Sequence, residues 1–283
     1  MTARRGSPTA RRRRLGAELR RLRDASGFTI ESVAERLECS ASKISRIETG
    51  QIGASPRDVR DILTIYGSPA SEIESLVQVA REARQKGWWQ SYGVVLTGAY
   101  VGFEAAADRI EAYEVLCVPG LLQTAEYARQ LMLVGNPDMD QEEIENRIRI
   151  RKQRQSLLTQ DEPVDLWVVL DEAVLARLVG GAEVMRPQLE RLATEAERPN
   201  VTIQVLPFRA GAHSGMEGPF CILRFDEEVD PDMTYVAMAT GGIFQEKEDE
   251  MARYSFVFDR LRETALSPEE SVKLIIDRAR ELQ

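Results

Sequence analysis

Apolar residues recur at helical spacing through the first third of the chain. Leu15, Leu19 and Leu22 share one face of a predicted first helix, and Gly27 can end it. Four more short helices are predicted after residues that favour helix starts: Thr29, Ser40, Ser55-Pro56, and Ser71 with Glu74 as a capping box. Residues 15–84 are therefore expected to form a compact all-helical domain.

The pattern changes after an aromatic stretch that begins at Gly87 and includes Trp88, Trp89 and Tyr92. Strands are predicted at Val164–Leu170, Val201–Leu206, Phe220–Phe225 and Thr234–Ala239, where β-branched and aromatic residues gather. Helices are predicted at 104–116, 122–133, 141–158, 173–179, 185–197, 250–264 and from Ser267. The predicted fold class is thus multidomain, an all-α domain followed by an α+β domain over 87–283, with a small sheet flanked by helices.

Charge divides the chain in the same way. Residues 1–66 hold 14 Lys and Arg against 8 Asp and Glu, whereas the remaining 217 residues hold 23 against 38. Residues 1–14 contain six arginines and almost nothing apolar, so we expect a flexible basic arm that either adds solubility or follows the phosphates of DNA. The basic N-terminal part of the chain is expected to be attracted to a polyanion, whereas the acidic remainder is expected to be repelled by it.

Composition excludes several other classes of protein. No apolar run approaches the roughly 18 residues of a membrane helix, and the N-terminus lacks the apolar stretch of a secretory signal. Cys39, Cys117 and Cys221 are far apart and His213 is the only histidine, which argues against a disulfide framework and a zinc site. We expect a cytoplasmic protein with no cofactor and no metal.

The second and third predicted helices form a helix-turn-helix, joined by Glu38, Cys39 and Ser40. Helix 41–49 is expected to enter the major groove of double-stranded DNA, because a braced helix fits that groove. Ser42, Lys43 and Arg46 lie on its outward face, where serine, lysine and arginine can contact base edges. The full predicted DNA-binding set is Thr29, Ser40, Ser42, Lys43, Ser45 and Arg46, with Thr29, Ser40 and Ser45 suited to phosphates and caps.

The segment FTIESVAERLECSASKISRIETG resembles the helix-turn-helix of the phage-repressor (Cro/cI, or Xre) family. The matching positions are Ala34, then Ser40, Ile44, Ser45, Glu48 and Gly50, then Pro56. Family members often have glutamine directly after the cap of the second helix, where this chain has Ile30, so that backbone contact is not transferred. The resemblance also implies that Glu48 is structural and pairs with an arginine of the first helix, for which Arg20 is the expected partner.

The remainder resembles a domain of uncharacterised function that follows the helix-turn-helix in many regulators of filamentous actinobacteria. The motifs that carry this resemblance include WWQSY (88–92), VPGLLQT (118–124), the RIRIRKQRQSLL run, VVLDEAVL (168–175), QVLPF (204–208) and the SPEES start (267–271). The resemblance implies a transcriptional regulator, described for related proteins as antitoxin-like, with a small acidic partner protein encoded nearby.

Several motifs in the second domain have a structural reading that we favour over a functional one. VPGLLQT is expected to be a turn with a buried Leu121-Leu122 pair and Thr124 as a helix cap, rather than a binding loop. The basic run 147–155 reads as a solvated or ion-paired helix face, and Asp171-Glu172 as a helix start. Cys39, His213 and Trp167 are interpreted in turn as a packing residue, an exposed loop residue and a core residue.

The leading hypothesis is a sequence-specific transcriptional regulator, a repressor or antitoxin-like factor that binds an operator as a homodimer. A second hypothesis makes the large domain a sensor of a small molecule, which a cavity lined by Trp and Tyr would support. A third makes it a docking surface for a small partner protein, which an exposed apolar patch would support. An enzyme is the weakest reading, since no cluster of catalytic side chains is evident.

Overall fold

The computed structural model describes residues 8–84, 98–225, 232–239 and 241–282 of the chain. They form two units: a helical unit that ends at Ala106 and a second unit that begins at Ala107. Trp88, Trp89 and Tyr92, which the sequence placed at the domain boundary, lie outside the described residues. The helical region followed by a sheet flanked by helices confirms the predicted fold class.

The first unit contains the five predicted helices and one more. They are α1 (Pro8–Ala25), α2 (Ile30–Arg36), α3 (Ala41–Glu48), α4 (Pro56–Tyr66), α5 (Ala70–Ala83) and α6 (Gly98–Glu104). Apolar faces of α1 to α5 meet in one core, which includes Leu15, Leu19, Val33, Ile44 and Val59, all at most 2% exposed. The helical periodicity of the sequence therefore identified the buried faces correctly.

Short polar side chains begin three of these helices. Thr29 caps α2, Ser40 caps α3, and Ser55 forms a reciprocal capping box with Asp58 at the start of α4. The prediction for the fifth helix was wrong in detail. Pro69 occupies the N-cap of α5 without a side-chain hydrogen bond, so Ser71 and Glu74 form no capping box there.

The flexible arm expected over residues 1–14 was wrong for residues 8–14. Helix α1 begins at Pro8, so residues 8–14 continue the helix instead of leaving it. Arg13 is 7% exposed, which shows that this turn packs against the rest of the unit. Arginine is a good helix former. A run of arginines has no apolar periodicity, however, so the hydrophobic pattern does not predict this part of the helix. Residues 1–7 lie outside the described part of the chain.

The second unit is built on a mixed six-stranded sheet. Its strands are β1 (Arg109–Glu114), β2 (Asp165–Asp171), β3 (Val201–Leu206), β4 (Phe220–Arg224), β5 (Met233–Met238) and β6 (Gly241–Gln245), in the order β3-β2-β1-β4-β5-β6. β1, β2 and β3 are parallel, and the β4, β5 and β6 pairings are antiparallel. The central strand β1 places Ala112 opposite Val168 on one side and Cys221 on the other.

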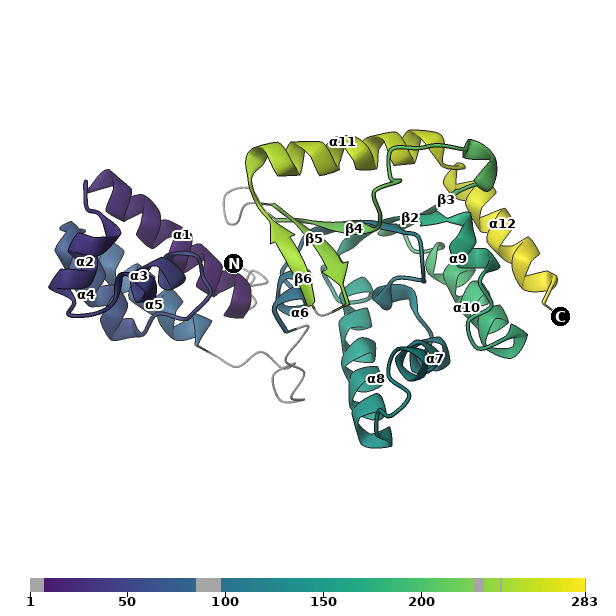
Figure 1. Ribbon diagram of the computed structural model, residues 1–283, viewed down its shortest axis with the longest axis horizontal. Helices are drawn as coiled ribbons and strands as arrows, with labels where there is room; N and C mark the ends of the chain where they lie inside the picture. The colour runs from purple at the N-terminus through teal and green to yellow at the C-terminus, as the bar shows by residue number, and fades with distance from the viewer. Residues whose placement is uncertain (1–7, 85–97, 226–231, 240, 283) are drawn as a thin grey trace. The chain divides into compact units, whose positions relative to one another are not determined.

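Helices cover both faces of the sheet (Figure 1). They are α7 (Ala125–Gly135), α8 (Gln141–Gln155), α9 (Glu172–Ala176), α10 (Ala182–Glu195), α11 (Glu248–Thr264) and α12 (Pro268–Arg280), with short 3₁₀ turns at Gly120–Leu122, Ser156–Leu158 and Phe208–Ala210. Helix α11 runs along one face over a core that includes Tyr113, Val169, Phe220 and Phe258, while α7 and α8 lie on the opposite side.

Two strands were not predicted from the sequence. The helix expected over 104–116 was wrong: α6 ends at Glu104, and residues 109–114 form β1. Alanine and glutamate in this segment favour helix locally, but hydrogen bonds to strands on both sides outweigh that preference. Strand β6 begins with Gly241-Gly242, which carries no strand signal, so the sheet has six strands where roughly four were expected.

Two further findings concern the described residues. None of their helices combines the length and apolar character needed to cross a membrane. They also bring together no group of three or more His, Cys, Asp or Glu side chains that is able to hold a metal ion.

Candidate nucleic-acid interface

Helix α3 presents a polar face to solvent and buries the opposite one. Ile44 and Ile47 are at most 2% exposed in the core, whereas Ser42 and Arg46 are exposed. The Ser40 side chain accepts a hydrogen bond of 3.2 Å from the Lys43 amide and so fixes the first turn. Ser40 itself is exposed, so the helix N-terminus, with its partial positive charge, lies at the protein surface.

The turn before α3 depends on an unusual backbone conformation. Glu38 has a φ of 50°, which makes it the one non-glycine residue with positive φ in the described ranges. The Cys39 amide then donates to the Ala34 carbonyl at 2.9 Å, and the partly buried Cys39 side chain packs on the helical core. These contacts hold α2 and α3 together and agree with the packing role expected for Cys39.

A buried ion pair connects α1 with the end of α3. Arg23 Nε donates to Glu48 Oε1 at 2.7 Å, and Arg23 Nη2 donates to Glu48 Oε2 at 3.0 Å. The structural role expected for Glu48 is confirmed, but the expected partner was wrong. Arg20 is exposed and lies 3.9 Å from Asp24, because the helix turns Arg23 and not Arg20 toward the core.

Helices α1 and α3 also approach closely at a glycine. A Cβ atom on Gly16 would lie 2.4 Å from the Ile47 carbonyl oxygen and 2.7 Å from that of Glu48. Only glycine allows this crossing without a shift of the backbone. The pose of α3 is therefore set by backbone contact as well as by the ion pair.

Lys43 forms an ion pair within the helical unit. Its ammonium lies 2.8 Å from Asp58 Oδ1, at the start of α4. The hydrogen bond to Asp58 raises the pKa of Lys43, and hydrogen bonds from Lys43 and Ser55 lower the pKa of Asp58 despite its partial burial. Sequence reasoning missed this partner, since the two residues are 15 positions apart and nothing local connects them.

Arg46 is the less constrained of the two cations on α3. Its Nε donates a long hydrogen bond of 3.4 Å to the Ser42 carbonyl, and it makes no ion pair with any described residue. Ser42 and Arg46 are one helical turn apart on the exposed face. These two predicted site residues therefore lie together on the exposed face of α3.

The other predicted contacts lie at helix ends. The Thr29 side chain accepts from the Ser32 amide at 3.2 Å and caps α2, as expected. Ser45 is half-buried, and its carbonyl accepts a hydrogen bond of 2.9 Å from the Thr49 hydroxyl. The sequence did not single out Thr49, which is exposed on the last turn of the same face as Ser42.

The competing motifs of the second unit have structural roles. Leu121 and Leu122 are buried, and Thr124 caps α7 by accepting from the Tyr127 amide, which confirms the reading of VPGLLQT as a turn. Asp171 caps α9, as expected for a helix start, and the Glu172 carboxylate accepts from the Phe208 amide at 2.8 Å.

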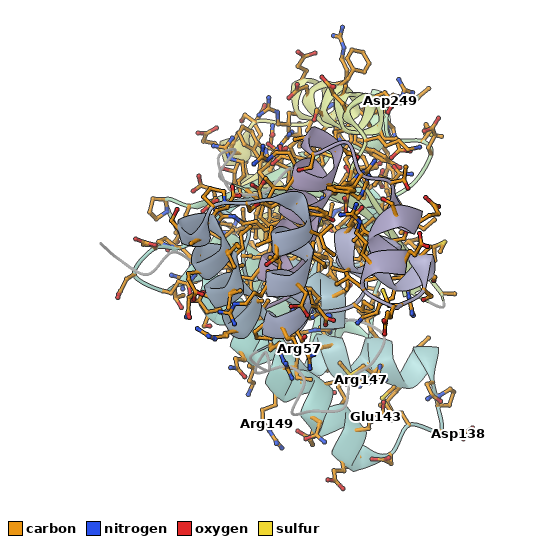
Figure 2. The ribbon with its side chains drawn as sticks, turned by 90° about the vertical axis from the view of Figure 1, so that its left-hand side faces the viewer. Arg57, Asp138, Glu143, Arg147, Arg149 and Asp249 are labelled. Carbon is orange, nitrogen blue, oxygen red and sulfur yellow. The ribbon has the colours of Figure 1, made fainter. Side chains whose placement is uncertain are left out.

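The basic run of α8 is partly ion-paired. Arg147 donates to Glu143 on the same helix, while Arg149 is exposed and points away from the ribbon (Figure 2). The Arg151 guanidinium donates to the Gln123 side chain in a partly buried contact. The expectation of a solvated or ion-paired helix face is therefore confirmed for Arg147 and Arg149, whereas Arg151 contacts a buried side chain.

His213 and Trp167 are the last two residues of the second unit for which the sequence predicted a structural role. His213 Nδ1 accepts from the Gly215 amide at 3.2 Å and its ring packs edge-on against Tyr113, so this loop residue is only partly exposed. Trp167 is half-buried, donates from Nε1 to Gln204 at 2.9 Å and lies under the Arg262 guanidinium. Both side chains therefore make contacts within the second unit.

Comparison with known proteins agrees with this geometry. A family model described as "Helix-turn-helix domain" matches residues 14–76, which cover most of α1, all of α2 to α4 and the first half of α5, and this domain indicates a DNA-binding regulator. A second model, described as "Domain of unknown function (DUF5753)", matches residues 97–277. Neither the curated proteins nor the solved structures contain a match to the chain. The chain thus belongs to the DUF5753 family and carries a helix-turn-helix domain ahead of that family's domain.

Proposed function

We propose that the chain is a sequence-specific transcriptional regulator of the Xre (Cro/cI-like) type, which places α3 in the major groove of an operator. The observation that carries the proposal is the exposed pair Ser42 and Arg46 on a helix held from behind by a buried ion pair. The basic charge of residues 1–66 supports it, because it supplies sequence-independent attraction to phosphates.

The residues of the interface take different roles in this proposal. Arg46 reads a base edge, for which guanine O6 and N7 are the matching acceptors, and Ser42 makes a less selective contact beside it. Thr29 and Ser40 already cap helices, so they orient backbone amides toward phosphates. Ser45 is half-buried and contributes at most one contact from its hydroxyl.

Lys43 requires a separate argument, because Asp58 competes with DNA for its ammonium. A phosphate that approaches Lys43 must displace a carboxylate at 2.8 Å or share the cation with it. Since the pair is partly exposed, this exchange costs little. We assign Lys43 to the phosphate backbone, where a point charge is sufficient.

The chain is proposed to act as a homodimer that represses transcription or serves as an antitoxin-like factor. Two copies on a two-fold axis place two α3 helices about one turn of DNA apart, and this multiplies the affinity. The antitoxin-like reading adds a small partner protein, which should be encoded next to the gene and should co-purify with the chain. A cytoplasmic location follows from action on DNA.

We further propose that the chain has no enzymatic activity. The acids at the end of strand β2 are already engaged: Asp171 Oδ1 accepts from the Ala173 amide, and Glu172 pairs with Arg278 at 3.1 Å. Acids used as helix caps and ion-pair partners are poorly placed for proton transfer to a substrate.

Selection of genomic fragments with the purified full chain, followed by footprinting, tests the proposal. The selected duplex is then titrated with the parent, with Arg46→Ala and with Arg81→Ala. Arg81 is a matched control, because it is an exposed arginine of the same unit on α5.

We expect Arg46→Ala to weaken operator binding by about 1–3 kcal/mol and to relax the preference at one base pair. Arg81→Ala should bind the operator like the parent. Equal losses for both variants would assign Arg46 a general electrostatic role and contradict its role as a base reader.

A further inference from the structure

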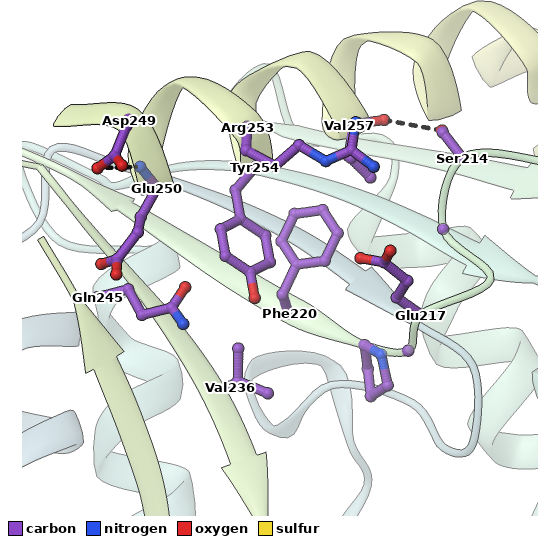
Figure 3. A pocket seen from close by; sticks show the side chains of 13 residues that line it. Ser214, Glu217, Phe220, Val236, Gln245, Asp249, Glu250, Arg253, Tyr254 and Val257 are labelled. Carbon is purple, nitrogen blue, oxygen red and sulfur yellow. Dashed lines mark hydrogen bonds between the residues drawn. The ribbon is translucent and has the colours of Figure 1, made fainter. Parts of the chain in front are cut away.

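A cavity of about 320 Å³ lies in the second unit, between α11 and the sheet. Its walls come from the 214–219 loop, from β4 and β5, from the last residue of β6, and from the first three turns of α11. Figure 3 shows Phe220, Tyr254 and Gln245 around the same space, with Val236 below them and Glu217 on the loop. This volume is at the lower end of the range for small-molecule sites.

The loop that closes the cavity is held on two sides. Ser214 Oγ donates to the Val257 carbonyl of α11 at 3.1 Å. Gly215 lies so close to Tyr113 that a Cβ atom would be 2.4 Å from Cε1 of that ring. The cavity wall is therefore a built feature of the fold, fixed to a helix and to the central strand.

One half of the cavity is apolar and aromatic. The rings of Phe220 and Tyr254 lie 4.9 Å apart between centroids and are tilted by 56°, and Val236 and Val257 complete this side. Phe220 is only 5% exposed, and its ring forms an apolar surface on this side. Such a surface takes an aromatic or alkyl body, and aromatic faces also attract cations.

The other half carries an excess of negative charge. Three carboxylates line the cavity, Glu217, Asp249 and Glu250, against one guanidinium, that of Arg253. Glu250 lies 3.3 Å from Lys247, whereas Glu217 has no ion-pair partner among the described residues. Burial, followed by the charges of Glu217 and Glu250, raises the pKa of Tyr254, which is a further sign of a negative field at this wall.

The lining also contains a polar group without a partner. Gln245 Oε1 is buried and accepts no hydrogen bond from the described residues. An unmade hydrogen bond of this kind is costly, and the terminal amide of glutamine rotates readily. Rotation turns one amide atom toward the cavity, where a polar group of a bound molecule can satisfy it.

We propose that this cavity binds a small organic cation, in which an aromatic or alkyl body carries an ammonium or related charged nitrogen. The body lies against Phe220 and Tyr254, and the cationic nitrogen faces Glu217. A neutral molecule would leave the carboxylates unused, and an anion would be repelled by them. The proposal concerns binding to the second unit and is independent of DNA recognition by α3.

Isothermal titration of the full chain with 2-phenylethylamine hydrochloride near neutral pH tests the proposal. Two probes of the same body serve as controls: 2-phenylethanol is neutral, and phenylacetate is an anion. We expect the amine to bind more tightly than the alcohol by about fivefold or more, and phenylacetate to bind most weakly. No binding of the amine, equal binding of amine and alcohol, or preferential binding of phenylacetate would each overturn the proposal.

Substitutions then locate the site. Glu217→Gln should weaken amine binding by about threefold or more and leave alcohol binding unchanged, because it removes charge and keeps shape. Arg253→Gln should strengthen amine binding, since it removes a like charge. Val236→Phe should reduce the affinity for both probes by filling the cavity, with folding checked by circular dichroism.

Glu269→Gln is the matched control, because Glu269 is an exposed carboxylate in the first turn of α12 and does not line the cavity. An equal loss of amine affinity in Glu269→Gln and Glu217→Gln would show that the amine responds only to the overall negative charge, and the proposed site would be wrong. Operator binding is measured separately, so a failure of either proposal is recognised independently of the other.

Discussion

Substitution of Glu48 by alanine tests how α3 is held in its pose. Arg23 and Glu48 are 9% and 4% exposed at their side chains, and two hydrogen bonds join them. Without Glu48, Arg23 keeps its contacts with Asp24 Oδ1 at 2.7 Å and with the Phe28 carbonyl at 2.9 Å. Two of its four hydrogen bonds are lost, and the buried charge loses its main counterion.

The expected cost follows from these contacts. Breaking a buried ion pair by removing one partner costs about 3–5 kcal/mol, and the retained contact with Asp24 places Glu48→Ala near the lower end, at about 3 kcal/mol. For a domain of this size, a loss of about 1 kcal/mol lowers the melting temperature by roughly 4–8 °C. Hydrogen exchange of the full chain, read by mass spectrometry on peptides from α1 and α3, measures the local free energy of unfolding.

Two further variants make the test decisive. The double substitution Arg23→Met with Glu48→Leu removes both charges and should cost less than the single substitution, because no buried charge remains unpaired. Glu18→Gln breaks the exposed pair between Glu18 and Arg21 and should cost less than about 1 kcal/mol. A Glu48→Ala loss below about 1 kcal/mol, or a double variant less stable than the single one, would refute the reasoning.

Three other perturbations test separate features. Asp58→Asn removes the ion-pair partner of Lys43, so the affinity of the chain for a random DNA duplex at low salt should rise by about two- to fivefold, as measured by fluorescence anisotropy. An unchanged affinity would mean that Lys43 does not reach the phosphate backbone of the DNA. Glu38→Gly relieves the positive φ of 50° and should stabilise the helical unit by about 1 kcal/mol in the same exchange experiment. Burial raises the pKa of Glu114 from 4.5 to about 8, so stability that is full below pH 4.5 should fall as the pH rises through 8. A shift of this size corresponds to a stability loss of at most about 5 kcal/mol, and we expect about half of that because Glu114 is partly exposed. Urea titrations across this pH range measure the loss, and Glu114→Gln should remove it.

The helical unit was largely predictable because its signals are local. Thr29, Ser40 and Ser55 cap the helices that follow them, and the leucine spacing marks the buried face of α1. The start of α1 was missed, since arginines at 11–14 give no apolar period. The sheet was harder to predict, because β1 becomes a strand only through pairing with β2 and β4, which are distant in the sequence.

The candidate site was likewise predictable where its features depend on local sequence, and not where they depend on packing between helices. The exposure of Ser42 and Arg46 follows from helical periodicity, which places them opposite Ile44 and Ile47. The ion pair of Lys43 with Asp58 depends on how α4 packs beside α3, and no spacing rule predicts it. The choice of Arg23 over Arg20 as the partner of Glu48 likewise depends on the rotation of α1, which periodicity defines only coarsely.

The central claim is that α3 reads sequence, and a ratio of two affinities tests it most directly. The dissociation constant of the full chain is measured for the selected duplex and for a scrambled duplex of equal length and base composition, in the same buffer and salt. The account predicts that the selected duplex binds about a thousandfold or more tightly. A ratio close to one at every salt concentration would contradict it, because binding would then rest on charge alone.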